Sequence, residues 1–209
     1  MEKHIAAVPL DKAYRLLNHG PTVLVAARHD GTDNVMAAAW ACALDYAPLK
    51  LTVVLDKTAK TRELVEKSGR MVIQIPTVAL VDLTYKVGHR SLLDDPDKLA
   101  NSGVELFDFD GHDLPFVAGC SAWLACRVLP EPKNEQTYDL FIAEIESAWS
   151  DTRVFKDGHW NFETADPGLR SLHYIAGGHF YAIGEAIDVD EGGQDGGLNP
   201  GGSLANASS

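Results

Sequence analysis

The segment DGTDNVMAAAWACALDY, residues 30–46, constrains the fold more than any other part of the sequence. It contains five alanines, so helix propensity alone favours an α-helix. The flanking runs TVLVAAR (22–28) and LKLTVVLD (49–56), however, have the composition of β-strands, and the segment opens with an Asp-Gly pair typical of a tight turn. We therefore expect residues 34–40 to form a strand with methyl groups on both faces.

The rest of the sequence favours a mainly β fold with a few helices. Strand composition and tight-turn signals recur at short spacing, and they predict further strands over 70–76, 120–129, 137–151, 154–160 and 179–189. Helix start and stop signals, such as Gly69 after the last apolar position, predict helices over 10–20, 57–69, 77–88 and 95–103. Short strands joined by tight turns are typical of an antiparallel barrel with helices packed on it.

Length and charge limit the classes of protein to which the chain can belong. Its 209 residues, 45% of them hydrophobic, fit one domain over 1–189, and the glycine-rich segment 190–209 is expected to be disordered. A formal net charge of −12 argues against nucleic acid or an anionic membrane as a partner. No segment has the length and apolarity of a membrane span and no signal peptide is evident, so a cytoplasmic protein is expected. The three cysteines, Cys42, Cys120 and Cys126, form no C-x-x-C pair and are interpreted as reduced core thiols.

The common catalytic motifs are missing from the sequence. It has no G-x-G-x-x-G, P-loop, H-E-x-x-H or G-x-S-x-G, and its eight histidines are scattered without metal-ligand spacing. We therefore expect no metal site and no catalytic side chain. If the protein is an enzyme, a cofactor must supply the reactive group.

Two explanations account for the alanines. The strand could pack tightly under a helix or a second sheet, or it could form a shelf on which a flat ligand lies close to the backbone. Asn34 and Trp40 are six residues apart, a spacing that places both on one face of a strand. An amide and an aromatic side chain with methyl groups between them suit a planar heteroaromatic ligand, which favours the shelf.

A helix start rich in threonine and basic residues follows the second strand. The relevant residues of DKTAKTRELVE are Lys57, Thr58, Lys60, Thr61 and Arg62. Helix N-termini bind phosphate through free N–H groups and the helix dipole. Helix capping by the threonines and a solvated face for the basic residues are the alternative explanations.

These segments resemble the flavin reductase-like proteins that bind FMN in a split β-barrel, especially the flavoredoxin-like branch. The resemblance extends over roughly residues 10 to 188. It rests on DGTDNVMAAAWA, KTAKTRELVEKSGRMVIQIP, DPDKLANSGVEL, LPFVAGCSAWLACRV, YDLFIAEI and HYIAGGHFYAIGEAI, taken in order. The fold that it implies is mainly β with helices, a split antiparallel β-barrel of the FMN-binding type with a few packed α-helices.

The resemblance also implies where FMN binds. The flavin ring is expected against the strand that includes Asn34, Val35, Met36, Ala37, Ala38 and Trp40, largely through backbone groups. The phosphate is expected at Thr58 and Thr61. Lys98 matches a lysine that often approaches the flavin, and the alternative is an exposed helix residue. Tyr138 stands where many relatives have histidine, so it can donate a hydrogen bond but cannot titrate near neutral pH. Tyr174 either stacks near the flavin or braces the end of the barrel.

Three functional interpretations follow. The first is an NAD(P)H:flavin oxidoreductase, in which N5 of FMN accepts a hydride from a reduced nicotinamide. The second is an electron carrier that takes electrons from a redox protein through tightly held FMN. The third is a flavin-free barrel that binds another flat ligand. The family resemblance also implies a homodimer, with the flavin near the subunit boundary.

Overall fold

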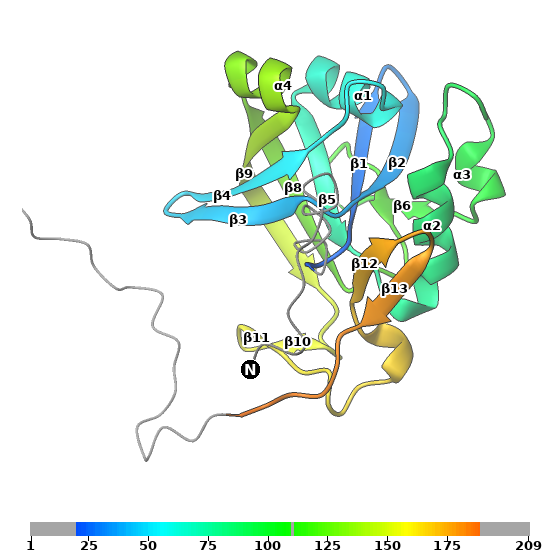
Figure 1. Cartoon of the computed structure of the whole chain (residues 1–209). Coiled ribbons are helices and arrows are strands. Elements are labelled where there is room, and N and C mark those ends of the chain that lie inside the picture. The colour runs from blue at the N-terminus through cyan, green and yellow to red at the C-terminus, as the bar shows by residue number, and fades with distance from the viewer. Residues whose placement is uncertain (1–19, 110, 189–209) are drawn as a thin grey trace, which may run out of the picture.

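The core of the protein is one antiparallel sheet of seven strands in the order β2-β1-β5-β8-β9-β4-β3 (Figure 1). The computed structural model describes residues 20–109 and 111–188. The strands of the sheet are β1 Val23–His29, β2 Thr32–Ala38, β3 Ala41–Tyr46, β4 Leu49–Val54, β5 Arg70–Ile75, β8 Ala122–Leu129 and β9 Leu140–Ser150. The predicted mainly β, antiparallel fold with packed helices is confirmed.

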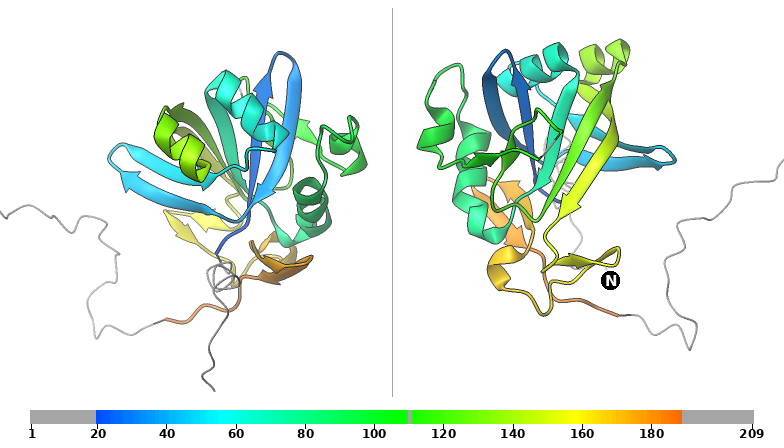
Figure 2. Two further views of the ribbon diagram at one scale, coloured as in Figure 1. Left: turned by 45° about the horizontal axis from the view of Figure 1, so that its top comes forward. Right: turned by 180° about the vertical axis from the view of Figure 1, so that it is seen from behind.

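The connection between β2 and β3 closes the barrel. The two strands follow each other in the chain with only Ala39 and Trp40 between them, yet they form opposite edges of the sheet. A covalent link this short forces the sheet to curl until its edges meet, and the result is a split barrel from which the β3–β4 hairpin projects (Figures 1 and 2). The expected continuous strand over 34–40 is therefore wrong, because the chain bends after Ala38.

The sheet is buried on both faces. Alternate residues of β1 point in opposite directions, so Val25 lies in the interior core while Leu24 lies in a second core outside the barrel. Leu64 and Val65 of α1 (Lys60–Ser68) cover the interior, and α2 (Val81–His89) packs on the outer face. Two short strands, β6 Leu106–Phe107 and β7 Phe116–Val117, complete the outer layer. Burial on both sides explains why residues 23–27, VLVAA, are all apolar.

The helices follow the sequence signals in part. α1 ends at Gly69, whose φ of 66° is the left-handed conformation expected of a glycine stop, but the helix begins at Lys60 rather than near residue 57. The predicted helix 77–88 appears as η3 (Val78–Leu80) followed by α2, and α3 (Lys98–Asn101) lies within 95–103. A further helix, α4 (Pro132–Tyr138), was not predicted. Tyr138 therefore ends a helix, and the strand expected from residue 137 begins at Leu140.

The C-terminal part forms two small hairpins below the barrel in Figure 1. β10 (Phe155–Lys156) and β11 (His159–Trp160) pair across the predicted Asp-Gly turn. After η4 (Pro167–Leu169), β12 (Leu172–Ala176) pairs with β13 (His179–Ala182), which ends well before the predicted residue 189. The predicted helix 10–20, apart from its last residue, and the segment 190–209 lie outside the described residues.

The expectations for the cysteines and for membrane-spanning segments can also be compared with the structure. Cys120 and Cys126 are buried, and burial raises the pKa of Cys126 to about 12, but Cys42 is exposed on β3, so its interpretation as a core residue was wrong. Within 20–109 and 111–188, no helix has both the length and the apolar character needed to cross a bilayer.

Candidate functional site

Three adjoining cavities surround the edge strand β2. They measure about 210, 240 and 390 Å³ and share lining residues, so they form neighbouring parts of one site. Met36 and Asp56 line both the second and the third cavity, and Ala37, Ala38 and Ala39 line both the first and the third. The site therefore runs along β2, with a polar end near Asn34 and an apolar, aromatic end near Ala39.

The polar end combines buried side chains from three elements. Asn34 of β2, Thr61 of α1 and Lys98 of α3 line the cavity of about 240 Å³, and none of them is more than 2% exposed. The amide nitrogen of Asn34 donates to Thr61 Oγ1 at 2.9 Å. Burial lowers the pKa of Lys98 from 10.5 to about 8, because a charged ammonium loses hydration there. A buried ammonium in a cavity is well placed to bind an anion.

Backbone N–H groups at the start of α1 add to this end. The helix begins after Ala59, which has no side chain that can cap the first turn. Thr58 lies before the helix and is exposed; its hydroxyl and its N–H donate to Asp56 Oδ1 at 2.6 and 2.8 Å. These two bonds lower the pKa of Asp56. Thr58 lines the cavity as predicted, but its hydroxyl is already used in a turn.

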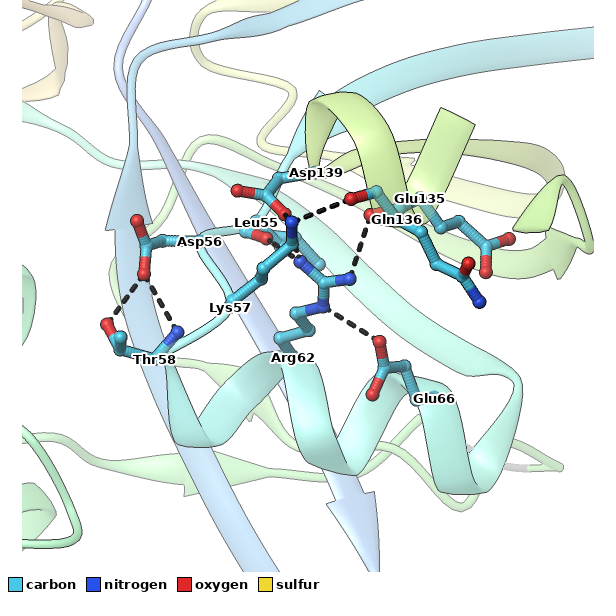
Figure 3. A network of polar contacts seen from close by, with 9 residues as sticks. All are labelled: Leu55, Asp56, Lys57, Thr58, Arg62, Glu66, Glu135, Gln136 and Asp139. Atoms are coloured by element: carbon cyan, nitrogen blue, oxygen red, sulfur yellow. Dashed lines mark hydrogen bonds and ion pairs between the residues drawn. The ribbon is translucent and has the colours of Figure 1, made fainter. Parts of the chain in front are cut away.

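Arg62, expected to supply charge to a phosphate, is committed to a structural network instead (Figure 3). It is buried and donates to the backbone oxygens of Leu55 and Glu135 at 3.0 and 2.8 Å, and to the carboxylates of Glu66 and Asp139 at 2.7 and 2.5 Å. The network ties α1 to the end of α4, as Figure 3 shows. It thereby fixes the place where the chain turns into β9.

Of the other basic residues, some stabilise the fold and others line the polar cavity, which is the cavity of about 240 Å³. Lys57 donates to the backbone oxygen of Gln136 at 2.6 Å and lines none of the three cavities. Lys60 lines the polar cavity, and its Nζ also lies 2.7 Å from Oε2 of Glu63, which is outside the cavity lining. Arg90, which was not predicted, lines it as well, from the residue after α2. The cationic lining is therefore Lys60, Arg90 and Lys98, and Asp56 is its only carboxylate among the described residues.

The aromatic end lies around the bend between β2 and β3. Trp40, Tyr138 and Tyr174 line the cavity of about 390 Å³, and the first two are 52% and 64% exposed. Asn34 and Trp40 were expected on one face of a strand; instead Trp40 lies beyond the bend, on the far side of the alanines. The structure thus places an amide and an aromatic side chain at opposite ends of the site.

The alanines serve both purposes that the sequence left open. A Cβ added to Gly88 of α2 would lie 3.1 Å from the Cβ of Ala37, so this position needs a small residue for helix packing. Ala38 and Ala39 line the cavities, where larger side chains would fill the space. Val35 is fully buried in the outer core, so only its backbone can reach a ligand.

Tyr174 also combines its two expected roles. Its hydroxyl accepts a hydrogen bond from the N–H of Gly177 at 3.1 Å, which braces the β12–β13 hairpin, and its ring lines two of the cavities. No pattern in the sequence indicated that Thr84 and His89 of α2 belong to the site, although both line the cavity of about 210 Å³. Their helix was predicted, but its position against β2 depends on tertiary packing.

A larger cavity of about 620 Å³ at the β1–β2 turn is a less suitable site. Arg28, the main cation there, lies 2.6 Å from Asp33 and 2.8 Å from Asp113, so carboxylates already satisfy its charge. No cluster of three metal-ligating side chains occurs within the described part of the chain.

The chain is similar in sequence and in structure to known proteins. The family model described as the flavin reductase like domain matches residues 14–184. The uncharacterized protein YddH of Escherichia coli (strain K12) is 38% identical over 183 residues, covering 86% of this chain and 95% of YddH. The structure of an FMN-binding domain of a flavin reductases-like enzyme from Shewanella baltica OS155 has 69% identity and a TM-score of 0.81, covering 88% of this chain and 97% of the other. Flavoredoxin of Desulfovibrio vulgaris (Miyazaki F) has 25% identity and a TM-score of 0.72, covering 92% and 98%.

Proposed function

This chain belongs to the flavin reductase-like domain family, and we propose that it binds FMN and catalyses NAD(P)H-dependent flavin reduction. The proposal places the phosphate of FMN in the polar cavity and its ring along Met36–Ala39, at the aromatic end. The FMN-binding domain from Shewanella baltica, with 69% identity, supports the choice of cofactor.

The observation that carries the proposal is the buried polar end of the site. Lys98 is 2% exposed in a cavity beside the uncapped start of α1, and Asn34 Oδ1 is buried there without a hydrogen-bond partner among the described residues. Buried polar groups of folded proteins are almost always paired, and buried charges are paired or bind ligands. A phosphate group on a hydroxylated chain meets both requirements. The phosphate supplies negative charge for Lys98, and a hydroxyl of the chain supplies a donor for Asn34 Oδ1.

The residues of this chain bind and orient the cofactor rather than react. FMN, when bound, would supply the redox chemistry by accepting a hydride from the nicotinamide and passing its electrons on. Lys98, Thr61 and the α1 N–H groups hold the phosphate, and the backbone of β2 orients the ring. Tyr138 lines the aromatic end of the site, where its hydroxyl can donate a hydrogen bond.

Replacing Thr61 with valine tests the phosphate site, because it keeps the shape and removes one hydroxyl. A lost hydrogen bond to a charged group is worth roughly 1.5–3 kcal/mol, so FMN affinity should fall about ten-fold or more. Riboflavin has the same ring without the phosphate, and its affinity should change little. Fluorescence quenching measures both ligands. Thr52→Val, on β4 outside the three cavities, is the matched control and should change neither. Equal weakening of both ligands by Thr61→Val would assign the threonine to the fold or the ring pocket.

Two assays separate the proposed reaction from its alternatives. Release of a flavin on denaturation excludes a barrel that binds another flat ligand. Oxidation of NADH or NADPH on addition of FMN distinguishes a flavin reductase from an electron carrier, and the likeness to flavoredoxin makes the carrier the second candidate.

We also propose a symmetric homodimer in the cytoplasm. β3 is an edge strand, and the hairpin that it forms with β4 exposes the side chains of Leu44 and Leu49. Exposed edges and apolar residues of this kind are commonly covered by a second copy of the chain. Light scattering at micromolar concentration should give twice the monomer mass, and a monomer mass would contradict the proposal.

A further inference from the structure

The side chain of Asn34 is placed to act on a ligand through Thr61. Asn34 projects from β2 with 2% exposure, and its amide nitrogen donates to Thr61 Oγ1, which is fully buried at the start of α1. The oxygen of Thr61 accepts this bond, so its own proton can be donated to a different acceptor. Both residues line the polar cavity, so a ligand bound there can provide that acceptor.

The carbonyl oxygen of the Asn34 side chain, Oδ1, also indicates a bound ligand. Oδ1 is buried and has no hydrogen-bond partner among the described residues. Each such atom in a folded protein calls for a specific explanation. An O–H or N–H donor from a bound ligand explains it here, since Asn34 lines the cavity that holds Lys98 and Thr61.

We propose that Asn34 is a positioning residue for phosphate binding: its Nδ2 orients the hydroxyl of Thr61 toward the phosphate, while its Oδ1 accepts a hydroxyl of the chain that carries the phosphate. This inference rests on the proposed FMN site and goes further, because it makes selectivity for the phosphorylated flavin depend on a pair of residues. Asn34 then contributes to phosphate affinity only when residue 61 has a hydroxyl.

A double-mutant cycle tests this coupling, with FMN and riboflavin as ligands and fluorescence quenching as the readout. Asn34→Leu removes the amide at similar volume and should weaken FMN about ten-fold in the wild-type background. In the Thr61→Val background the same change should weaken FMN about three-fold or less, because the hydroxyl that it orients is gone. Thr61→Ser keeps a hydroxyl and should restore the full effect of Asn34→Leu. For riboflavin the two substitutions should show no coupling.

The outcomes separate this inference from the proposed function. If wild-type protein fails to bind FMN, the function itself is wrong. If FMN binds but the effects of Asn34→Leu and Thr61→Val multiply independently, or if riboflavin shows the same coupling, Asn34 does not act through Thr61 on the phosphate. Thermal unfolding of the ligand-free variants checks their folding. Asn34→Ser, which is too short to reach Thr61 in the same way, replaces Asn34→Leu if the leucine variant does not fold.

Discussion

Replacing Lys98 with methionine should make the ligand-free protein more stable and make it a poorer FMN binder. The substitution keeps an unbranched side chain of similar length and removes the ammonium. Burial lowers the pKa of Lys98 from 10.5 to about 8. At 1.36 kcal/mol for each pKa unit, the charged form costs the folded state roughly 3 kcal/mol. Lys98→Met should therefore raise the free energy of unfolding by up to about this amount at pH 7.

The stability gained by Lys98→Met should depend on pH in a defined direction. Below pH 8, Lys98 is protonated in both the folded and the unfolded chain, so the full cost is present. Between pH 8 and 10.5 the folded protein loses the proton while the unfolded chain keeps it, and the wild type becomes more stable relative to the variant. Above pH 10.5 both states are neutral and the difference should vanish. Urea unfolding of ligand-free protein at pH 7 and near pH 10 measures this trend.

Ligand binding should change in the opposite sense. Loss of a charged hydrogen-bond partner should weaken FMN about ten-fold to a hundred-fold at pH 7, with riboflavin little affected. Wild-type affinity for FMN should fall as the pH rises above 8, and Lys98→Met should lack this decline. Lys86→Met, at an exposed position on α2, is the control and should change stability by less than about 0.5 kcal/mol. A Lys98→Met protein that is less stable at pH 7 yet binds FMN normally would refute the reasoning.

Two further substitutions test the elements that frame the site. Arg62→Met should lower the free energy of unfolding by about 3–5 kcal/mol, because it leaves Asp139 and Glu66 without their buried partner; the exposed Arg153→Met is the control in the same urea titration, and a loss below 1 kcal/mol for Arg62→Met would contradict the prediction. Gly88→Ala should lower stability by about 1 kcal/mol despite the better helix propensity of alanine, since the new Cβ meets Ala37 at 3.1 Å. Gly184→Ala, where a Cβ meets open space, is its thermal-unfolding control, and an unchanged melting temperature for Gly88→Ala would show that α2 can move away from β2.

The sequence predicted those parts of the fold that follow from local pattern. The central strands are apolar runs bounded by turns, and α1 has both an apolar face and a glycine stop. α4 escaped prediction because none of its residues is buried, so it has no apolar periodicity to detect. Its local signals are only Pro132 in the first turn and Glu135, whose side chain accepts a hydrogen bond from the N–H of Glu131 at 2.7 Å.

The structure brings some of the predicted site residues together and places others elsewhere. Asn34, Thr61 and Lys98 do meet in one cavity. Arg62 has the same local signature as a phosphate ligand, but its partners Glu135 and Asp139 lie more than 70 residues away in the chain. Trp40 was misplaced for a similar reason, since the bend before it arises from closure of the sheet.

The edge strand β2 explains why one segment can serve an elongated ligand. Its side chains alternate, so Asn34, Met36 and Ala38 follow one another along one face, and all three line the site. At about 3.3 Å per residue, the backbone carries the site over roughly 13 Å from the amide to the last of these methyl groups. The strand thereby sets the separation between a buried cationic end and an aromatic end. A mononucleotide with a planar ring has its charge and its ring at opposite ends in the same way, which is why a strand of small residues, rather than a helix, suits this position.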